Sequence, residues 1–306
     1  MRVRCQRRVG KWARAAAAAA TVALVVVACE EDEEPRPPLV GDCNDPACVE
    51  ARQGVPVTVI GVIPDVPGGD AGAGGAGGGG GMPPPSVGTL GGTVFEIVAT
   101  DLQTRQNLSG QVEVRAPSAS GGAADPVIAN TDSSGNFRLD GILASPVTWV
   151  GAGNFRNPPI EPYMDTLQAV DATSGQFVNL AVARRDAVRD AVSIAFMGDS
   201  LDFDPGLAHL ALRFVRSNGV PIAGVHISVP SPEQVPTAYD AGDAFTSALE
   251  ATSERGMALL VNMPAAAYPG VITTVVAELD GVQLSLEVQL AAGALTNVSA
   301  VVPEQP

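Results

Sequence analysis

The chain has 306 residues, enough for two domains of ordinary size, and carries 18 basic and 33 acidic residues for a formal net charge of −15. So acidic a chain repels phosphate backbones and anionic lipid surfaces, which argues against nucleic acid as a partner. Hydrophobic residues make up 46% of the chain but aromatic residues only 4%, so its cores must be aliphatic and suited to strands.

The amino-terminal segment has the anatomy of an export signal. Six basic residues occur before Ala15, and residues 15–28 then carry no charge. This apolar run of about 14 residues is short of the roughly 20 that a membrane-spanning helix needs. We therefore expect residues 1–28 to be a signal peptide that is removed, and not a permanent transmembrane anchor.

The signal ends in Val26-Val27-Ala28-Cys29, which resembles the lipobox of bacterial lipoproteins. The resemblance implies that cleavage leaves Cys29 as the amino terminus, with a diacylglyceryl thioether on its sulfur and usually an acyl chain on its amine. Two or more chains give stable anchoring where one is marginal. We expect a bacterial cell-envelope protein held in a membrane through the lipid on Cys29, with the outer membrane favoured over the inner one. The alternative is an ordinary signal peptide with a chance cysteine.

Residues 29–63 are expected to form an acidic tether. Residues 30–34 are all Glu or Asp, a composition typical of a solvated, disordered segment. Cys43 and Cys48 are the two cysteines that remain after the signal and the lipid site. Two thiols in an oxidising compartment usually pair, and the Asn-Asp-Pro-Ala spacer between them is typical of a turn, so we expect a local disulfide.

The next part of the chain contains one strand-like run and a low-complexity stretch. Residues 55–63 (VPVTVIGVI) look like a short strand, which either ends the tether or begins the next domain. Residues 64–92 hold a glycine-alanine tract and three consecutive prolines, a composition typical of a linker. The tract does not resemble a phosphate-binding loop, because no Gly-Lys-Ser/Thr follows it.

From Thr93 onward the pattern is that of strands. Short alternating or β-branched runs recur roughly every 8 to 12 positions with turn residues between them, which is typical of an antiparallel sandwich. Helix signals are nearly absent. We expect an all-β fold with two tandem antiparallel β-sandwich domains, transthyretin-like or immunoglobulin-like, at residues 93–198 and 206–303. Residues 199–205 would be an acidic junction between them.

The two expected domains look like copies of one another around one hairpin. Residues 131–139 (TDSSGNFRL) match residues 252–260 (TSERGMALL), so that Gly135 and Gly256 coincide. Glycine offers the positive φ that such a turn needs. Alternate residues after each glycine are apolar and share one face of a strand. They are Phe137 and Leu139 in the first copy, and Ala258 and Leu260 in the second.

The pattern G-x-P-x-x-G-V-x-I-x-V in residues 219–229, taken with T-D-x-x-G-x-F-x-L in residues 131–139, resembles the carboxypeptidase regulatory-like, or transthyretin-like, β-sandwich family. The resemblance covers about 210 residues. The second copy departs from it at Ala258, where phenylalanine is usual, and in a proline-rich insertion at residues 230–236. The family implies a seven-stranded module that supports or links other components and is rarely catalytic.

One motif points to catalysis. Gly198-Asp199-Ser200-Leu201 reproduces the tetrad after which an esterase family is named, with Ser200 as the nucleophile. That chemistry needs a base, normally a histidine three residues after an aspartate, and neither His209 nor His226 is so placed. Both histidines are expected at the surface of a sheet and not as metal ligands, since no His-Glu-x-x-His motif exists. We therefore expect no enzyme.

The sequence offers two further candidate binding sites, one for calcium and one for sugars. Asp199, Asp202 and Asp204 in the junction could offer oxygen ligands to calcium, although the spacing lacks the glycine and the final glutamate of a dedicated loop. Solvated linker charge is the alternative.

The other site would bind sugars, because β-sandwich modules often present aromatic rings to them. Its residues, from one loop-rich stretch of the first copy, are Trp149, Phe155 and Tyr163. Packing of Trp149 in the core is the alternative there.

Together these features predict a non-catalytic cell-envelope lipoprotein that presents two β-sandwich modules for a structural or protein-interaction role. Its partner would be an unidentified envelope or extracellular protein. No nucleic acid, resident metal or cofactor is expected. The alternative is a carbohydrate- or calcium-binding envelope module.

Overall fold

The computed structural model describes residues 86–155, 162–175, 177–199, 201–230 and 234–302. All of them belong to one compact unit, Gln53–Pro306. The expected signal peptide, the lipid site at Cys29, the Cys43–Cys48 disulfide and most of the expected linker lie outside the described residues, as does Ser200. Within the described ranges, no helix combines the length and the hydropathy needed to cross a membrane.

Strands make up nearly all the regular structure of the described residues, which confirms the expected all-β class. Eight strands precede the helix α2 (Arg185–Ala195): β1 (Val87–Ile97), β2 (Arg105–Asn107), β3 (Glu113–Ser118), β4 (Gly122–Asn130), β5 (Asn136–Leu143), β6 (Thr148–Gly153), β7 (Tyr163–Val170) and β8 (Val178–Arg184). Eight follow it: β9 (Ala208–Val215), β10 (His226–Ser228), β11 (Thr237–Ala241), β12 (Ala244–Thr246), β13 (Met257–Met263), β14 (Val271–Leu279), β15 (Val282–Leu290) and β16 (Ala294–Val301).

The strands before α2, called here the first half, include a closed ring. β1 pairs with β5 on one side and β8 on the other, β7 pairs with β6 and β8, and β3 joins β5 to β6. The ring encloses a core that includes Leu90, Val94, Val114, Leu139, Ile142, Val150, Leu180 and Val182. β1 and β8 run parallel, so this half differs from the antiparallel sandwich that the sequence predicts. Closing the ring removes sheet edges that an open sandwich would expose.

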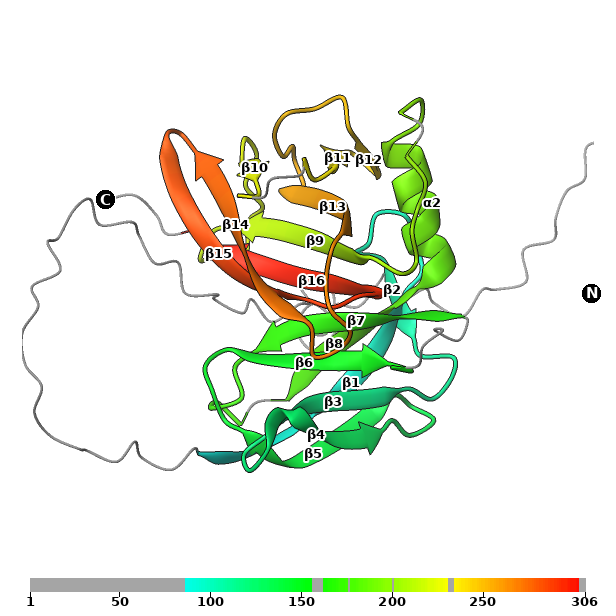
Figure 1. Cartoon of the computed structure of the whole chain (residues 1–306), viewed down its shortest axis with the longest axis vertical. Coiled ribbons are helices and arrows are strands. Elements are labelled where there is room, and N and C mark those ends of the chain that lie inside the picture. Colours follow the sequence, from blue (N-terminus) through cyan, green and yellow to red (C-terminus); the bar gives the residue numbers. More distant parts are fainter. Residues whose placement is uncertain (1–85, 156–161, 176, 200, 231–233, 303–306) are drawn as a thin grey trace, which may run out of the picture. The chain divides into compact units, whose positions relative to one another are not determined.

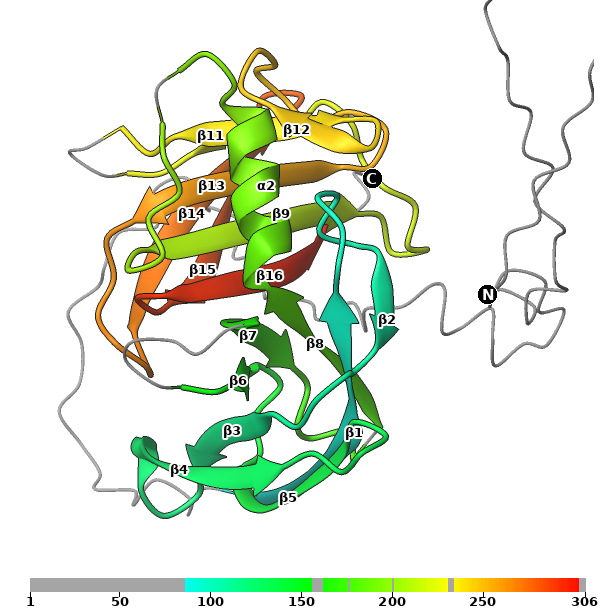
Figure 2. The same cartoon turned by 90° about the vertical axis from the view of Figure 1, so that its right-hand side faces the viewer.

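The strands after α2, the second half, form two layers. β12, β11, β13, β9 and β16 lie in that order in one sheet, while β10, β14 and β15 form a separate three-stranded sheet. The two layers share a core, to which the first contributes Leu210, Leu212, Phe214, Ala258 and Leu260 and the second Val275, Leu286 and Val288. The β14–β15 hairpin, orange in Figure 1, covers one face of the larger sheet. Helix α2 lies against the opposite face (Figure 2).

The two halves are joined by a strand pair and by a shared core. β16 pairs in parallel with β7, at residues 294–296 and 165–167, so one hydrogen-bonded sheet of 13 strands runs through both halves. A third core lies under α2 and draws on the first half (Ile97, Leu102, Met164, Ala181, Ala183), the helix (Val188, Ala191, Val192) and the second half (Ala211, Phe245, Met257, Leu259, Leu295). The expected junction at residues 199–205 therefore does not divide two independent cores.

Pairing repeats between the halves, as the hairpin match predicts. β9 pairs in parallel with β16 and antiparallel with β13, in the way that β1 pairs with β8 and β5. The two matched glycines occupy the same turn: Gly135 has φ +81° and Gly256 has φ +65°. The carbonyl of Gly135 accepts the N–H of Val94 at 2.9 Å, and the carbonyl of Gly256 accepts that of Phe214 at 2.8 Å. The structure therefore repeats this turn and this strand pairing in two halves that otherwise differ.

Helix α2 and the start of β1 were not predicted from the sequence. The buried residues of α2 recur at helical spacing: Ala187, Val188, Ala191, Val192 and Ala195. An 11-residue helix is too short to be stable alone, so its packing on the shared core stabilises it. β1 begins at Val87, inside the expected linker 64–92, because its early residues pair with β5.

Candidate functional site

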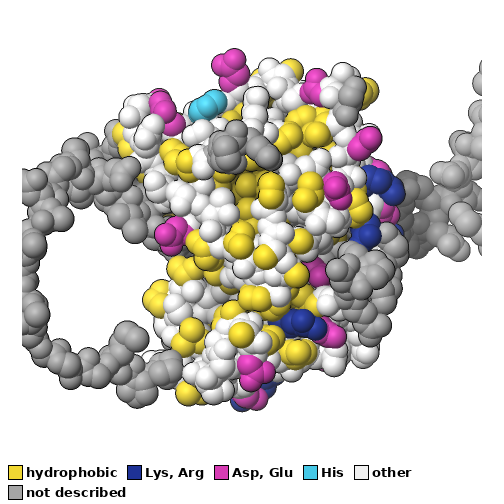
Figure 3. Space-filling view, viewed as in Figure 1, with side chains coloured by type: hydrophobic (Ala, Val, Ile, Leu, Met, Phe, Trp, Pro, Cys, Tyr) yellow, Lys and Arg dark blue, Asp and Glu magenta, His cyan; other side chains and the backbone are white. Residues whose placement is uncertain are grey.

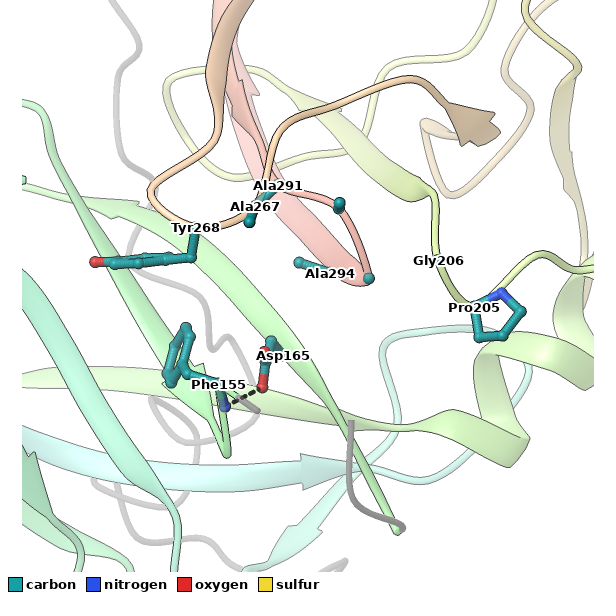
Figure 4. A pocket seen from close by; sticks show the side chains of 10 residues that line it. Phe155, Asp165, Pro205, Gly206, Ala267, Tyr268, Ala291 and Ala294 are labelled. Atoms are coloured by element: carbon teal, nitrogen blue, oxygen red, sulfur yellow. Dashed lines mark hydrogen bonds between the residues drawn. The ribbon is translucent and has the colours of Figure 1, made fainter. Parts of the chain in front are cut away.

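A small pocket lies where the two halves meet (Figure 4). Its volume is about 190 Å³, below the roughly 300–1,000 Å³ of typical small-molecule sites. The lining residues are Phe155 and Asp165 from the first half, and Pro205, Gly206, Ala267, Tyr268, Ala291, Ala292, Gly293 and Ala294 from the segment after α2. One carboxylate and two aromatic rings therefore face a space that admits only a small group.

Asp165, on β7, is the acidic group of this pocket. Its Oδ1 accepts hydrogen bonds from the backbone N–H groups of Asn154 and Phe155, both at 2.9 Å. Burial raises the pKa of Asp165, and these two bonds oppose the shift only in part. Gly153 makes the approach possible, because a Cβ there would lie 2.2 Å from Oδ1. The carboxylate therefore holds the chain in place after β6.

Phe155 links the two halves through its ring. The rings of Phe155 and Tyr268 meet edge to face, with centroids 5.0 Å apart and an interplanar angle of 66°. The guanidinium carbon of Arg115 lies 4.4 Å from the Phe155 centroid and 5.9 Å from that of Tyr268, a favourable cation–π arrangement. Phe155 has φ +47°, which is unfavourable for a bulky side chain. Asp165 and these ring contacts hold it there.

The structure does not bring the three predicted sugar-binding aromatic residues to one surface. Trp149 is 9% exposed and packs in the core between the two layers of the second half. Tyr163 is buried in the ring of the first half. Phe155 remains, and its ring neighbour is Tyr268. Trp149 therefore packs in a core, as the alternative to the sugar-site hypothesis has it, and the three rings do not share one surface.

A buried polar cluster surrounds Glu96, a residue that the sequence pattern does not mark as part of a site. The Glu96 carboxylate is 0% exposed and accepts hydrogen bonds from the side chains of Gln106 (2.7 Å), Ser109 and Tyr163, and from the Ser109 N–H (2.7 Å). Burial alone would raise the pKa of Glu96, but these hydrogen bonds outweigh it and lower that pKa. A carboxylate whose lone pairs are so fully satisfied fixes structure. The only sequence signal was a glutamate inside a β-branched run.

A larger open groove lies in the second half. Its volume is about 670 Å³, within the range of ligand sites. It is lined by Phe196, Asp199, Leu201, His226, Ile227, Ser228, Val229, Gln234, Val235, Pro236, Thr237, Tyr239, Ser247, Leu249 and Glu250. The carboxylate of Asp199 accepts a hydrogen bond from the hydroxyl of Ser247 at 2.7 Å, and Nδ1 of His226 lies 2.7 Å from the backbone oxygen of Glu250. The groove thus mixes apolar walls with polar groups that are already hydrogen-bonded.

The three calcium candidates are not gathered around one point. Asp199 faces Ser247, whereas Asp204 Oδ1 accepts the N–H of Gly206 at 2.8 Å. Asp202 uses its backbone oxygen, which accepts Nδ2 of Asn262 at 2.8 Å. No group of three His, Cys, Asp or Glu side chains within the described ranges is placed to hold a metal ion. The junction is instead tied to β13 through Asn262.

The two histidines have different environments. His226 is exposed on β10, as expected for a sheet surface. His209 is 0% exposed, which corrects the expectation. Its Nε2 lies 3.1 Å from the backbone oxygen of Asp204, and its ring stacks on Phe203 with centroids 4.8 Å apart. Burial lowers the pKa of His209 to about 4, so the ring is neutral at pH 7.

The surface carries apolar side chains on both halves. Figure 3 shows hydrophobic side chains spread over this face, with acidic side chains scattered mostly near its margin. Large exposed hydrophobic residues include Val87, Ile128, Phe177, Met197, Val271 and Ile272. Single exposed apolar residues are normal.

Comparisons with known proteins leave the family open. Neither a protein-family model nor a curated protein matches the sequence. Among solved structures, the Bacillus anthracis TIE protein is similar at 11% identity and a TM-score of 0.20, over 72% of this chain and 34% of that one. A streptococcal ancillary pilin is similar at 10% identity and a TM-score of 0.22, over 71% and 70%. The chain spans about a third of the first structure's length. Similarities this low do not indicate a shared family or role. The resemblance to the carboxypeptidase regulatory-like family stays a prediction.

Proposed function

We propose that this chain is a non-catalytic, lipid-anchored protein of the bacterial cell envelope, whose β-rich body is a rigid module for a structural or protein-interaction role. The observation that carries the proposal is the joining of the two halves. β7 pairs with β16, and the core under α2 draws on both halves. Two sandwich modules on a flexible link would move independently, whereas a shared sheet and core keep surfaces of both halves in one orientation.

The positions of the histidines support a non-catalytic role. His209 is buried with its Nε2 on a backbone oxygen, and His226 directs Nδ1 to another. Neither is hydrogen-bonded to a serine or threonine hydroxyl in the part of the chain that the structure describes. A general base must lie within hydrogen-bond reach of the proton it takes. Generic ester substrates should therefore not be hydrolysed, and Ser200→Ala should leave any background rate unchanged.

The length of chain before the body supports its display away from a membrane. Residues 29–86 separate the proposed lipid site from the start of β1. Fully extended, this length spans at most roughly 200 Å. The acidic composition of residues 30–34 favours solvation over contact with an anionic surface. A body on such a tether reaches partners well beyond the lipid headgroups.

The experiment that tests the proposal is intact-mass measurement of the protein taken from membranes of an expressing bacterium, with Cys29→Ser as the comparison. We expect a wild-type mass that begins at Cys29 and includes acyl chains, and loss of the added mass and of membrane association in the variant. Cys43→Ser is a matched control, because it removes another cysteine but should keep the lipid. An uncleaved or unlipidated wild-type product would contradict the proposal.

Carbohydrate binding is a second candidate, favoured by the Phe155–Tyr268 ring pair at the pocket between the halves. Tyr268→Ala should abolish a signal on a glycan array if this pair binds sugar. Val271→Ala, a change at an exposed residue of β14 near this pair in sequence, should not. Trp149 is unsuitable for the test, because its removal would leave a cavity in the core.

A further inference from the structure

Three arginines converge where the β1–β2 hairpin of the first half meets the second half. Arg105 begins β2, Arg213 lies on β9, and Arg255 lies in the turn before β13. On the sheet, Arg213 sits between Met257 of β13 and Ser299 of β16. The side-chain amide of Gln103, in the β1–β2 hairpin, contacts the sulfur of Met257. Figure 2 shows this hairpin beside the ends of β9 and β16.

Few carboxylates offset these charges. Nη2 of Arg255 lies 3.4 Å from Oδ2 of Asp101 and 3.4 Å from Oδ1 of Asp243, whose side chain is fully exposed. Asp101 is already engaged, because it accepts the N–H groups of Gln103 (2.9 Å) and Thr104 (2.8 Å) and the hydroxyl of Thr104 (2.7 Å). Both ion pairs are therefore long and shared, and their net effect on the three positive charges is small.

Two of the three arginines have no counter-ion in the described part of the chain. Nε of Arg213 is buried and has no hydrogen-bond partner there, and neither Arg105 nor Arg213 makes an ion pair with a described carboxylate. Burial and the charge of Arg213 lower the pKa of Arg105 to about 10. Burial and the charge of Arg255 lower the pKa of Arg213. Arg213 thus lies close enough to both Arg105 and Arg255 for their positive charges to act on one another.

Such a cluster is costly to keep without a counter-ion. An unpaired, partly buried charge destabilises a fold unless an opposite charge joins it. Arginine remains protonated at neutral pH and offers donors in a planar fork that fits two oxygens of one anion. The chain has an excess of acidic residues, yet among the described carboxylates only Asp101 and the fully exposed Asp243 form ion pairs with this cluster, both with Arg255.

We propose that the cluster of Arg105, Arg213 and Arg255 is an oxyanion-binding site at the joint between the two halves. Its ligand is a carboxylate, phosphate or sulfate group, bound by forked hydrogen bonds from guanidinium groups of both halves. Binding adds a bridge between the β1–β2 hairpin and β9, and so stiffens the joint. The probe for this site is inorganic sulfate, supplied as a free ion.

The test is the melting temperature of the mature chain, from residue 29 onward, in 10 mM sodium sulfate against sodium chloride of equal ionic strength. We expect sulfate to raise the Tm of wild type by about 2–4 °C, the effect of a ligand several-fold above its Kd. Arg213→Met should remove the response and raise the Tm in chloride, because an unpaired, partly buried charge is lost. Arg105→Gln should remove the response as well, and it alters a different strand if the first variant fails to fold.

Arg138→Gln is the matched control, because Arg138 is exposed and paired with Asp140 away from the cluster. Its sulfate response should equal that of wild type, which separates site binding from the general effect of sulfate on stability. A sulfate response that is the same in all variants, or absent from wild type, would overturn the proposal.

Discussion

Asp240 supplies to the turn of the second half the carboxylate that Asp132 supplies to the matching turn of the first. Oδ1 of Asp132 accepts the N–H groups of Ser134 and Asn136 at 2.8 and 2.9 Å. Asp240 accepts the N–H groups at the two matching positions, Arg255 and Met257, both at 2.9 Å. Ser253 stands where Asp132 stands in the first copy, and its hydroxyl donates to Asp240 at 2.7 Å. Both turns therefore have a carboxylate that accepts their N–H groups, but in the second half it comes from β11 and not from the turn itself.

Asp240→Ala should therefore destabilise the protein strongly. The side chain is 1% exposed, and its loss leaves the N–H groups of Ser253, Arg255 and Met257 without their acceptor. Unsatisfied buried donors cost about 1–3 kcal/mol each, so we expect a loss of about 3 kcal/mol or more in the free energy of unfolding, measured with urea. Asp132→Ala is the comparison. Its turn is exposed and water can replace the carboxylate, so its loss should be clearly smaller; equal losses would contradict this account.

The glycine at the repeated turn is required for space as well as for φ. A Cβ on Gly256 would lie 2.5 Å from the backbone oxygen of Phe214 and 2.8 Å from the nitrogen of Ile222. Gly281 has a similar φ of +78° but nothing within 4 Å of such a Cβ. Gly281→Ala should thus cost only the conformational strain, about 1–2 kcal/mol. Gly256→Ala should lower the free energy of unfolding clearly more in the same urea titration. A loss no larger than that of Gly281→Ala would show that the turn adjusts to a Cβ without added strain.

Stability should fall in mild acid because His209 is buried. Its pKa is lowered to about 4 in the folded protein, against about 6.5 in an unfolded chain. The unfolded state therefore binds a proton first as pH falls, and stability present above pH 6.5 is lost progressively between pH 6.5 and 4. The loss from this group is about 3 kcal/mol. His209→Phe, which keeps a ring beside Phe203, should remove that part of the pH dependence.

The measurement for His209 is the free energy of unfolding by urea at several pH values between 7 and 4, taken as the difference between variant and wild type so that the carboxylates cancel. His226→Gln is the matched control, because His226 is exposed. Its curve should follow that of wild type. If the His209→Phe curve also runs parallel to wild type, the buried ring is not the source of the acid sensitivity.

The shared core predicts one unfolding transition for both halves. Met164 of β7 lies in the core under α2 together with Leu259 and Leu295 of the second half. Scanning calorimetry should show a single peak whose van't Hoff and calorimetric enthalpies agree. Met164→Ala should cost about 2–5 kcal/mol and shift this one peak without splitting it. Two separate peaks in wild type would instead indicate independent domains.

Sequence alone was sufficient for the strand class and for the repeated hairpin. Strand alternation is a local signal, and a glycine at positive φ is a local requirement, so both are visible without the rest of the fold. Gly135 and Gly256 do occupy the same turn. The same kind of local signal predicts the lipobox at Cys29, which the intact-mass experiment tests.

Tertiary structure decided which side chains lie together. Trp149 and Tyr163 are near neighbours of Phe155 in sequence, but they fill two different cores, because strand pairing sends them to different faces. Helix α2 is stabilised by a core assembled from both halves, which no local window contains. The arginine cluster joins positions 105, 213 and 255, and its members meet only because a hairpin of one half packs on a sheet of the other. Long-range pairing, which local patterns do not encode, set these contacts.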